Sequence, residues 1–268
     1  MNFSVLLSLY HKEKPEFLKE CLESLKIQTL QATEIIMVFD GVVPTELEKV
    51  VMQYTSILTI KIIRLPQNVG LGKALNEGLK HCIYNWVFRM DTDDICLPDR
   101  FKKQVEFIKQ HPDVVLFSGH IAEFSDDKTK VTGYRKVPIG DKNIKKYAHS
   151  RSPFNHMTIA FRKDIIEAVG GYQHHLFLED YNLWLRVIAQ GYEVGNIDDV
   201  LLLARAGSNM VARRRGRDYI KGEWRLFNLK KQLKLQNIFS GFFIFLLRVF
   251  PRMLPTGILK ALYKYLRK

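Results

Sequence analysis

The stretch Trp86-Val87-Phe88-Arg89-Met90-Asp91-Thr92-Asp93-Asp94-Ile95 joins a short apolar run to three carboxylates within four positions. Carboxylates this close raise one another's pKa and oppose folding, unless a cation or strong hydrogen-bond donors neutralise them. Mg²⁺ and Mn²⁺ are suitable cations, because they take oxygen ligands from one or two carboxylates together with substrate phosphates. An acidic turn that caps a helix beginning at Pro98 is the competing interpretation, and the stretch alone leaves both open.

Strands and helices alternate on the N-terminal side of this stretch. Hydrophobic runs predict a strand that leads into Asp91 and earlier strands at residues 3–10, 34–39 and 58–65. Helices are expected from Pro15, from Pro44 and over residues 71–82. This order is typical of βαβ units, so we expect an α/β fold with a mostly parallel sheet and helices on both faces. Because ligands of such sheets bind at the carboxyl ends of the strands, Asp40 and the acidic cluster are expected at one edge, which favours a metal site over a turn.

Two nucleotide-binding motifs are excluded by the segment Gly70-Leu71-Gly72-Lys73-Ala74-Leu75. Leu75 occupies the third glycine position of a dinucleotide fingerprint, and the segment follows the third strand instead of the first. Ala74 stands where a P-loop needs Ser or Thr to reach the metal. The sequence therefore does not predict a Rossmann dehydrogenase or a P-loop enzyme.

The composition describes a folded protein with an uneven charge. With 47% hydrophobic and 26% charged residues, the chain of 268 residues can bury a large core. Three cysteines without zinc or disulfide spacing, and an apolar N-terminus without the basic region of a signal peptide, predict a cytoplasmic protein. After residue 203 the chain has 16 Lys and Arg against two acids, whereas the preceding part is nearly neutral. Such a basic tail suits nucleic acid or an anionic membrane surface.

The order of several short motifs resembles family 2 glycosyltransferases with the GT-A fold, a Rossmann-like α/β architecture. The motifs are Ser8-Leu9-Tyr10, Val38-Phe39-Asp40-Gly41, Asn68-Val69-Gly70 with Ala74-Leu75-Asn76, Asp91-Thr92-Asp93-Asp94 followed by Pro98 and Arg100, and Glu179-Asp180. The resemblance covers about residues 1–210, which implies a glycosyltransferase domain there and a helical tail at residues 211–268. Gly41, where many members have an acid or Ser, and Cys96 near the acidic motif depart from the pattern.

The resemblance implies roles for residues on the donor side. Asp40 would hydrogen-bond the uracil or ribose of a UDP-sugar, and Asn68 and Lys73 would line the nucleotide pocket. A helix-capping Asp40 before Pro44 and a solvated Lys73 are the structural alternatives.

The acidic motif and Arg205 complete the implied donor site. Asp93 would be the direct ligand of Mn²⁺ or Mg²⁺, and Asp91 would face the ribose or the metal. The ion would neutralise charge on the departing diphosphate, and Arg205, or the run Arg213 to Arg217, would close over the donor. Asp94 would contribute to this cluster or cap the following helix.

On the acceptor side, the resemblance points to His156 in the segment Ser152 to Thr158 and to the pair Glu179 and Asp180. An inverting transfer needs one base for the acceptor hydroxyl. Asp180 is the expected base, supported by Glu179, although two acids at the first turn of a helix also suit its dipole. A retaining double displacement would need a nucleophile near the anomeric carbon, and no motif indicates one.

The tail alternates basic and apolar residues. Residues 219–235 predict a basic amphipathic helix, and the apolar run at 238–247, interrupted by Arg248 and stopped at Pro251, is too short to span a bilayer. Residues 258–268 repeat the pattern. Helices of this kind lie in the headgroup plane of a membrane. Packing on the core or a homodimer contact are the alternatives.

These features predict an inverting, metal-dependent glycosyltransferase. By resemblance, it moves a hexose, galactose or glucose, from a UDP-sugar to a polyprenyl-diphosphate-linked saccharide in bacterial O-antigen or exopolysaccharide synthesis, at the inner face of the cell membrane. The competing classes are a nucleic-acid-binding protein and a membrane scaffold with a non-catalytic domain. The run Arg213 to Arg217 contains no aromatic residue for base stacking, so no nucleic acid partner is expected.

Overall fold

The computed structural model describes residues 1–125, 127–206 and 216–253, with side chains up to residue 250. Its strands are β1 (Ser4–Leu9), β2 (Glu34–Phe39), β3 (Ile60–Arg64), β4 (Trp86–Arg89), β5 (Ile95–Cys96), β6 (Val114–Phe124), β7 (Val131–Arg135), β8 (Ala160–Arg162) and β9 (Glu193–Arg205). Its helices are α1 (Pro15–Lys26), α2 (Thr45–Tyr54), α3 (Leu71–His81), α4 (Arg100–Gln110), α5 (Asp141–Tyr147), the 3₁₀ turn η1 (His156–Thr158), α6 (Lys163–Ala168), α7 (Glu179–Ala189), α9 (Arg217–Gln232) and α10 (Ile238–Met253). The alternation expected from the sequence between β1 and α4 is confirmed.

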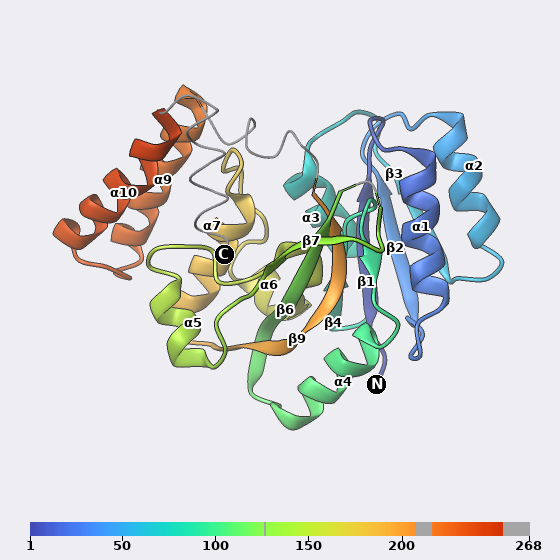
Figure 1. Cartoon of the computed structure of the whole chain (residues 1–268), viewed down its shortest axis with the longest axis horizontal. Coiled ribbons are helices and arrows are strands. Elements are labelled where there is room, and N and C mark those ends of the chain that lie inside the picture. The colour runs from blue at the N-terminus through green and yellow to red at the C-terminus, as the bar shows by residue number, and fades with distance from the viewer. Residues whose placement is uncertain (126, 207–215, 254–268) are drawn as a thin grey trace.

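All of these strands belong to one sheet, in the order β3-β2-β1-β4-β8-β6-β9-β5, with β7 beside β6 (Figure 1). The strands β3, β2, β1 and β4 are parallel, as the βαβ pattern predicts. The second half of the sheet is mixed, because β8 runs antiparallel to both β4 and β6, while β6 and β9 are parallel. The segment between β6 and β9, which contains α6 and α7, supplies the crossover that parallel strands require.

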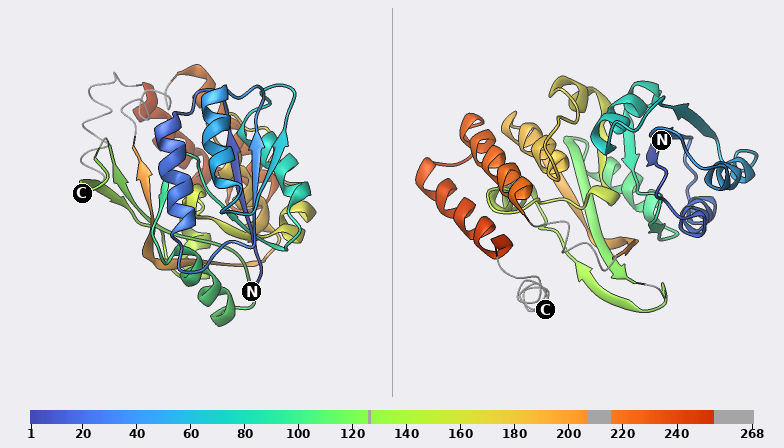
Figure 2. Two further views of the ribbon diagram at one scale, coloured as in Figure 1. Left: turned by 90° about the vertical axis from the view of Figure 1, so that its right-hand side faces the viewer. Right: turned by 90° about the horizontal axis from the view of Figure 1, so that it is seen from above.

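Helices cover both faces of the sheet (Figure 2). One face carries the apolar sides of α1, α2 and α4, where Leu18, Leu22 and Leu25 of α1 are buried at the spacing expected for an amphipathic helix. The other face carries α3, α5, α6, α7 and α9. The buried strands β1 and β2 read as nearly continuous apolar runs because they are covered on both sides.

The C-terminal helices form a hairpin that rests on the fold through α9. Tyr219 and Leu226 of α9 belong to the core cluster that also contains α7, and α10 lies beside α9 (Figure 1). Arg248 of α10 joins the two helices, because its Nε donates to Glu223 Oε2 at 2.6 Å and its Nη2 to Glu223 Oε1 at 2.8 Å. Packing on the core, one of the alternatives for the tail, is therefore present in α9 and in the inner side of α10.

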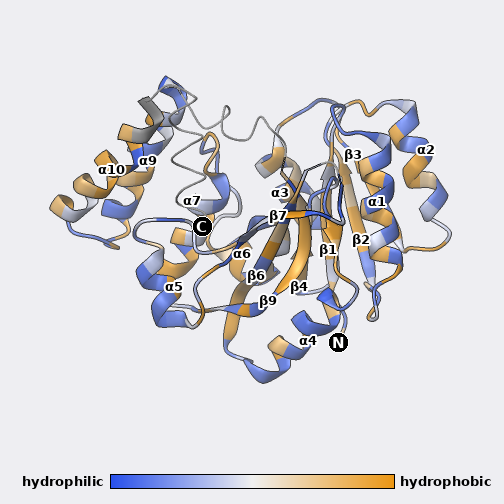
Figure 3. Cartoon of the chain, viewed as in Figure 1, coloured by the Kyte–Doolittle hydropathy of each residue, from blue (hydrophilic) through white to orange (hydrophobic). Residues whose placement is uncertain are grey.

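The outer side of α10 is apolar and exposed (Figure 3). Its exposed apolar side chains are Ile238, Phe239, Phe242, Phe243, Leu246, Leu247 and Phe250. Helix α10 continues past Pro251 to Met253, because a proline within a helix removes one hydrogen bond and can kink the helix without ending it. Residues 258–268 and the run Arg213 to Arg215 lie outside the described residues. Across residues 1–125, 127–206 and 216–253, no helix is both long and apolar enough to cross a membrane.

Lys230 of α9 gives the stability of the protein a pH dependence. Its buried ammonium group donates to His149 O at 2.7 Å and to Tyr181 Oη at 2.9 Å. Burial, assisted by the nearby charge of Arg248, lowers the pKa of Lys230 from its ordinary value of 10.5 to about 7. At pH values between about 7 and 10.5, Lys230 is mostly protonated in the unfolded chain and mostly deprotonated in the folded chain. Its contribution to the free energy of unfolding therefore rises with pH in this range.

Replacing Lys230 with Met is expected to remove that rise. Urea denaturation at pH 7 and at pH 9 measures the free energy of unfolding of both proteins. The difference between wild type and variant should shift in favour of the wild type from pH 7 to pH 9. Lys231→Met, at the exposed neighbouring position, is the matched control and should leave the pH slope unchanged. Equal slopes in wild type and Lys230→Met would contradict the depressed pKa.

Candidate active site

The carboxyl ends of β1, β2 and β4 lie at one edge of the sheet, because these strands are parallel neighbours. The loop after β1 carries Glu13, Asp40 follows β2, and the acidic cluster follows β4. The C-terminal end of β9 reaches the same edge, where the backbone N–H of Arg205 donates to Asp94 Oδ1 at 3.0 Å. Segments far apart in the sequence therefore meet around Asp91 to Asp94, as the strand pattern predicted.

Asp91 is held by the last residue of β4. The guanidinium of Arg89 is buried and binds both carboxylate oxygens of Asp91, with Nη1 2.6 Å from Oδ2 and Nη2 paired with Oδ1. The Asp91 side chain keeps 32% of its surface exposed, so one side of the carboxylate still faces the site. The sequence had suggested no role for Arg89, although its place between an apolar run and a run of acids is a signal for an internal counter-ion.

Breaking this pair is expected to destabilise the fold. Arg89→Ala leaves the partly buried Asp91 without its cation, and we expect a loss of about 3 kcal/mol in the free energy of unfolding. Chemical denaturation measures this loss. Arg162→Ala is the matched control, because Arg162 pairs with Asp164 on the surface and an exposed pair contributes less than about 1 kcal/mol. A similar small loss for both variants would show that the Arg89 bridge is not important for stability.

Asp93 is a half-buried acid surrounded by other acids. Burial raises the pKa of Asp93 to about 7, and the negative charges of Asp91 and Glu13 add to the shift. Glu13 accepts a hydrogen bond from Thr92 Oγ1 at 2.6 Å, which holds the loop after β1 against the acidic motif. Glu13 is a second residue that the sequence did not single out, and only the pairing of β1 with β4 brings it here.

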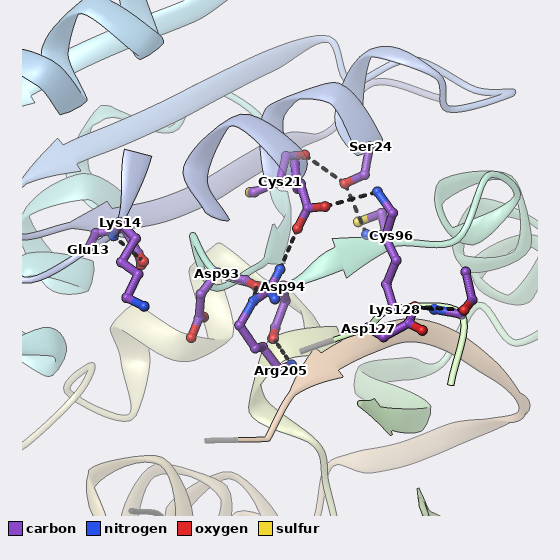
Figure 4. A network of polar contacts seen from close by, with 12 residues as sticks. Glu13, Lys14, Cys21, Ser24, Asp93, Asp94, Cys96, Asp127, Lys128 and Arg205 are labelled. Carbon is purple, nitrogen blue, oxygen red and sulfur yellow. Dashed lines mark hydrogen bonds and ion pairs between the residues drawn. The ribbon is translucent and has the colours of Figure 1, made fainter. Parts of the chain in front are cut away.

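Asp94 and Arg205 connect the acidic motif to β9 and α1 (Figure 4). Asp94 is buried, and the expectation that it caps the following helix is wrong, because its Oδ1 accepts the N–H of Arg205 while Asp99 precedes α4. Arg205 Nε donates to Asp93 O at 3.2 Å, and its guanidinium pairs with Glu20. The same guanidinium lies 3.7 Å from the ring centre of Phe17. Arg205 thus holds the edge of the site together.

The other oxygen of Asp94, Oδ2, is buried without a hydrogen-bond partner among the described residues. Burial raises the pKa of Asp94 well above its usual range, and the charges of Asp91 and Asp93 contribute. The acidic motif therefore contains more negative charge than its protein partners neutralise, which is the electrostatic environment that a divalent cation fits.

Asp40 organises the loop before α3. Its Oδ1 accepts the N–H of Val69 at 2.7 Å, and its Oδ2 accepts the N–H of Gly70 at 3.1 Å and Asn68 Nδ2 at 3.0 Å. The helix-capping alternative for Asp40 is wrong, because Pro44 is the residue that precedes α2. A Cβ at Gly41, whose φ is +88°, would lie 2.6 Å from the N atom of Asn68, which explains why glycine stands at this position.

The beginning of α3 faces the beginning of α7. A Cβ at Gly72 would lie 3.3 Å from Tyr172 Cβ and 3.7 Å from Glu179 Cγ, so Gly72 permits a close approach. Lys73, on the first turn of α3, is exposed. The loop expected to hold the nucleotide and the acids expected to serve the acceptor are therefore adjacent.

The hydroxyl of Tyr172 contacts His156 and feels the charges of both acidic groups. His156 Nε2 lies 2.8 Å from Tyr172 Oη, and burial together with the charge of Arg89 holds the pKa of His156 well below its usual range. Burial also raises the pKa of Tyr172. The positive charge of Arg89 opposes this shift, and the negative charges of Asp180, Asp91 and Glu179 add to it. His156 is thus a neutral imidazole in contact with Tyr172. Tyr172 is a third site residue that sequence reasoning missed, and the Gly170-Gly171 turn before it was the available signal.

Glu179 and Asp180 occupy the first turn of α7. Burial raises the pKa of Glu179, and the charge of Asp180 contributes; Glu179 Oε2 is buried without a partner among the described residues. The side chain of Asp180 is partly exposed. A partly exposed carboxylate beside a buried one, at a helix N-terminus that favours the ionised form, can accept a proton from a bound hydroxyl group.

Comparisons with known proteins find relatives along nearly the whole chain. The chain is 55% identical over 269 residues, covering all of both chains, to an uncharacterised glycosyltransferase of Haemophilus influenzae. It is 48% identical over 266 residues, covering 99% of both chains, to the amylovoran biosynthesis glycosyltransferase AmsE of Erwinia amylovora. It is 37% identical over 270 residues to the UDP-Gal:alpha-D-GlcNAc-diphosphoundecaprenol beta-1,3-galactosyltransferase of Escherichia coli, covering 98% of this chain and 95% of the relative.

Solved structures show the same fold at lower identity. TarS of S. aureus (residues 1–349) aligns with a TM-score of 0.69 at 20% identity, covering 94% of this chain and 71% of that one. The mannosyltransferase PcManGT of Pyrobaculum calidifontis, solved with GDP-Man and Mn²⁺, aligns with a TM-score of 0.66 at 15% identity, covering 99% and 80%. Fold and relatives together define a glycosyltransferase with a GT-A-like architecture. Residues 4–170 match the model of glycosyl transferase family 2, and the chain belongs to this family.

Proposed function

We propose that this glycosyltransferase moves a hexose, galactose or glucose, from a UDP-sugar to a saccharide linked to polyprenyl diphosphate, with inversion at the anomeric carbon. The main support for the proposal is the position of Tyr172 between two groups of acids. One group is the acidic motif, whose negative charge is only partly neutralised by protein partners, and the other is the pair Glu179 and Asp180. The full-length similarity to a galactosyltransferase that uses UDP-Gal and a diphosphoundecaprenol-linked acceptor supports the choice of donor and acceptor. The similarity to an amylovoran biosynthesis enzyme supports a role in surface polysaccharide synthesis.

The donor would bind along the edge formed by the ends of β1, β2 and β4. Asp40, Asn68 and Lys73 would contact the nucleoside, with Asp40 acting mainly by shaping the loop at residues 68–70. Asp93 would hold Mn²⁺ or Mg²⁺, and the exposed side of Asp91 would contact the metal or the ribose. When bound, the ion supplies charge neutralisation for the departing diphosphate.

The residues present fit such an ion. Among the described residues, no group of three His, Cys, Asp or Glu side chains forms a closed metal cage. Mg²⁺ and similar ions in nucleotide sites need only one or two carboxylates, because substrate phosphates and water complete the coordination shell. The excess negative charge at Asp93 and Asp94 matches this kind of open site.

On the acceptor side, Asp180 would remove the proton of the attacking hydroxyl group. Glu179, whose Oε2 is buried, would stay beside it and help to keep the attacking oxygen in place. His156, as a neutral imidazole, would orient Tyr172 and bind the acceptor by hydrogen bonds. Arg205 would complete the donor side by holding the backbone of Asp93.

The proposal also includes the location of the enzyme in the cell. The exposed apolar side of α10 and the basic residues of α9 suit the headgroup region of the inner face of the cell membrane, which is where a lipid-linked acceptor resides. A homodimer through the same helices is the competing use of this surface. Co-sedimentation with anionic vesicles at low protein concentration distinguishes a membrane surface from a dimer contact.

A panel of UDP-sugars tests the function directly. With Mn²⁺ present, one UDP-hexose should raise the melting temperature more than UDP, and the same donor should transfer its sugar to a synthetic GlcNAc diphospholipid. GDP-mannose is the control nucleotide sugar. Stabilisation by GDP-mannose but not by any UDP-sugar would contradict the proposed donor.

A further inference from the structure

A groove lies between α9 and α10. Ile220, Trp224 and Phe245 form its apolar lining, and Lys221 and Arg225 complete it. Its volume of about 360 Å³ is within the range of small-molecule sites. Trp224 is 46% exposed and packs edge-on against Phe245 at 5.4 Å between ring centres, so its indole forms an open wall.

Helix α9, which carries the groove, also contacts the loop that precedes Glu179 and Asp180. Tyr219, which precedes Ile220, stacks on Phe177 with ring centres 5.5 Å apart and planes 10° from parallel. Phe177 is 47% exposed and lies three residues before Asp180. Its φ of +66° is unusual for a bulky residue, and such strain is retained only where the surrounding structure imposes it.

Contacts with α9 impose this conformation. His175 Nε2 bonds to Gly222 O at 2.8 Å, and its Nδ1 lies 3.0 Å from Asn182 Nδ2. A Cβ at Gly222 would lie 3.1 Å from Leu176 O, so the loop and the helix approach closely because this position is glycine. The loop that presents Phe177 is therefore built onto the helix that carries the groove.

The charges beside the groove select its ligand. Lys221 and Arg225 are one helical turn apart, so they lie on one face of α9. Lys221 forms only an exposed pair with Asp218 at 3.4 Å, which is weak. The one acid in the middle of α9, Glu223, is buried and already paired with Arg248. An apolar slot with two cations at its rim suits a hydrocarbon chain that begins with a diphosphate.

We propose that this groove binds the isoprenoid diphosphate end of the lipid-linked acceptor. The inference rests on the proposed function for the identity of the acceptor. The hydrocarbon lies on Trp224 and Phe245, and Arg225 and Lys221 contact the diphosphate. Phe177 directs the attached saccharide toward Asp180. The groove is thus an acceptor subsite separate from the metal and nucleotide site.

Calorimetry with farnesyl diphosphate tests the proposal without relying on transfer. The titration uses the full chain with EDTA and without nucleotide, so the proposed metal and donor site does not contribute. Farnesyl diphosphate should bind more tightly than inorganic diphosphate or farnesol. Trp224→Ala and Arg225→Ala should each weaken binding by about tenfold.

Phe243→Ala is the matched control, because Phe243 is an exposed aromatic of α10 that does not line the groove. Unchanged binding in this variant, with weakened binding in Trp224→Ala, supports the groove. Equal losses in both variants would indicate adsorption to the apolar face of α10 and overturn the proposal, and so would the absence of farnesyl diphosphate binding. Failure of the UDP-sugar panel would instead overturn the proposed function, since the calorimetry uses no donor. Phe245→Ala, which removes the other aromatic wall of the groove, should also weaken farnesyl diphosphate binding, and unchanged binding in this variant would contradict the groove.

Discussion

Asp180→Asn is expected to lower the transfer rate by about 10²- to 10⁴-fold, the range that a general base contributes. Asparagine keeps the size and hydrogen-bonding reach of the side chain but cannot take a proton from the acceptor hydroxyl. Asp180 is partly exposed at the start of α7, and burial raises the pKa of its neighbour Glu179. The loss should therefore fall on the chemical step, and donor binding should persist.

Two measurements separate the base from a binding role. The turnover number for transfer should fall, while the thermal stabilisation by the UDP-sugar and Mn²⁺ should match the wild type. Asp113→Asn is the control, because Asp113 is an exposed acid just before β6, outside the acidic clusters. Near-normal transfer in Asp180→Asn would mean that another group, Glu179 or His156, removes the proton.

Asp93→Asn is expected to remove the dependence of donor binding on Mn²⁺ and to lower transfer by at least about a hundredfold. Asp93 is the acid of the motif that is surrounded by other acids, whereas Asp91 is bound by Arg89. Its replacement leaves the ion without its principal protein ligand. The added stability that the UDP-sugar and Mn²⁺ together provide should disappear.

The metal-free protein gives an independent check. Removing one of several crowded negative charges should not lower the melting temperature in EDTA, and it should raise it slightly. Asp91→Asn is the informative contrast, because it leaves the buried Arg89 without its counter-ion and should lower the metal-free melting temperature. A variant Asp93→Asn that still responds to Mn²⁺ would refute the assignment of Asp93 as the metal ligand.

Most of the fold between β1 and α4 was predictable because its signals are local. The strand β2 and the helix α1 have the expected bounds, since apolar runs and proline positions set them within a few residues. The antiparallel place of β8 was not predictable, because its three residues carry no periodic signal. Strand pairing in this half of the sheet depends on contacts between segments far apart in the chain.

The candidate site likewise has a part that the sequence predicts and a part that depends on tertiary contacts. The sequence by itself predicted the acids Asp91, Asp93 and the pair Glu179 and Asp180, because the acidic run follows a predicted buried strand and the pair stands in a motif that resembles the family. It could not show what those acids contact. Glu13 and Tyr172 enter the site only through strand pairing and helix packing, as the hydrogen bond of Glu13 to Thr92 illustrates.

Within the stretch from Trp86 to Ile95, the sequence determined that negative charge would collect at the end of a buried strand. Only the tertiary structure decided how that charge is shared. Arg89 neutralises Asp91, the backbone of Arg205 binds Asp94, and Asp93 is left among other acids. The physical reason is that neutralisation depends on distances between groups, and folding brings together groups that are up to 185 positions apart in the chain, as Glu20 and Arg205 are.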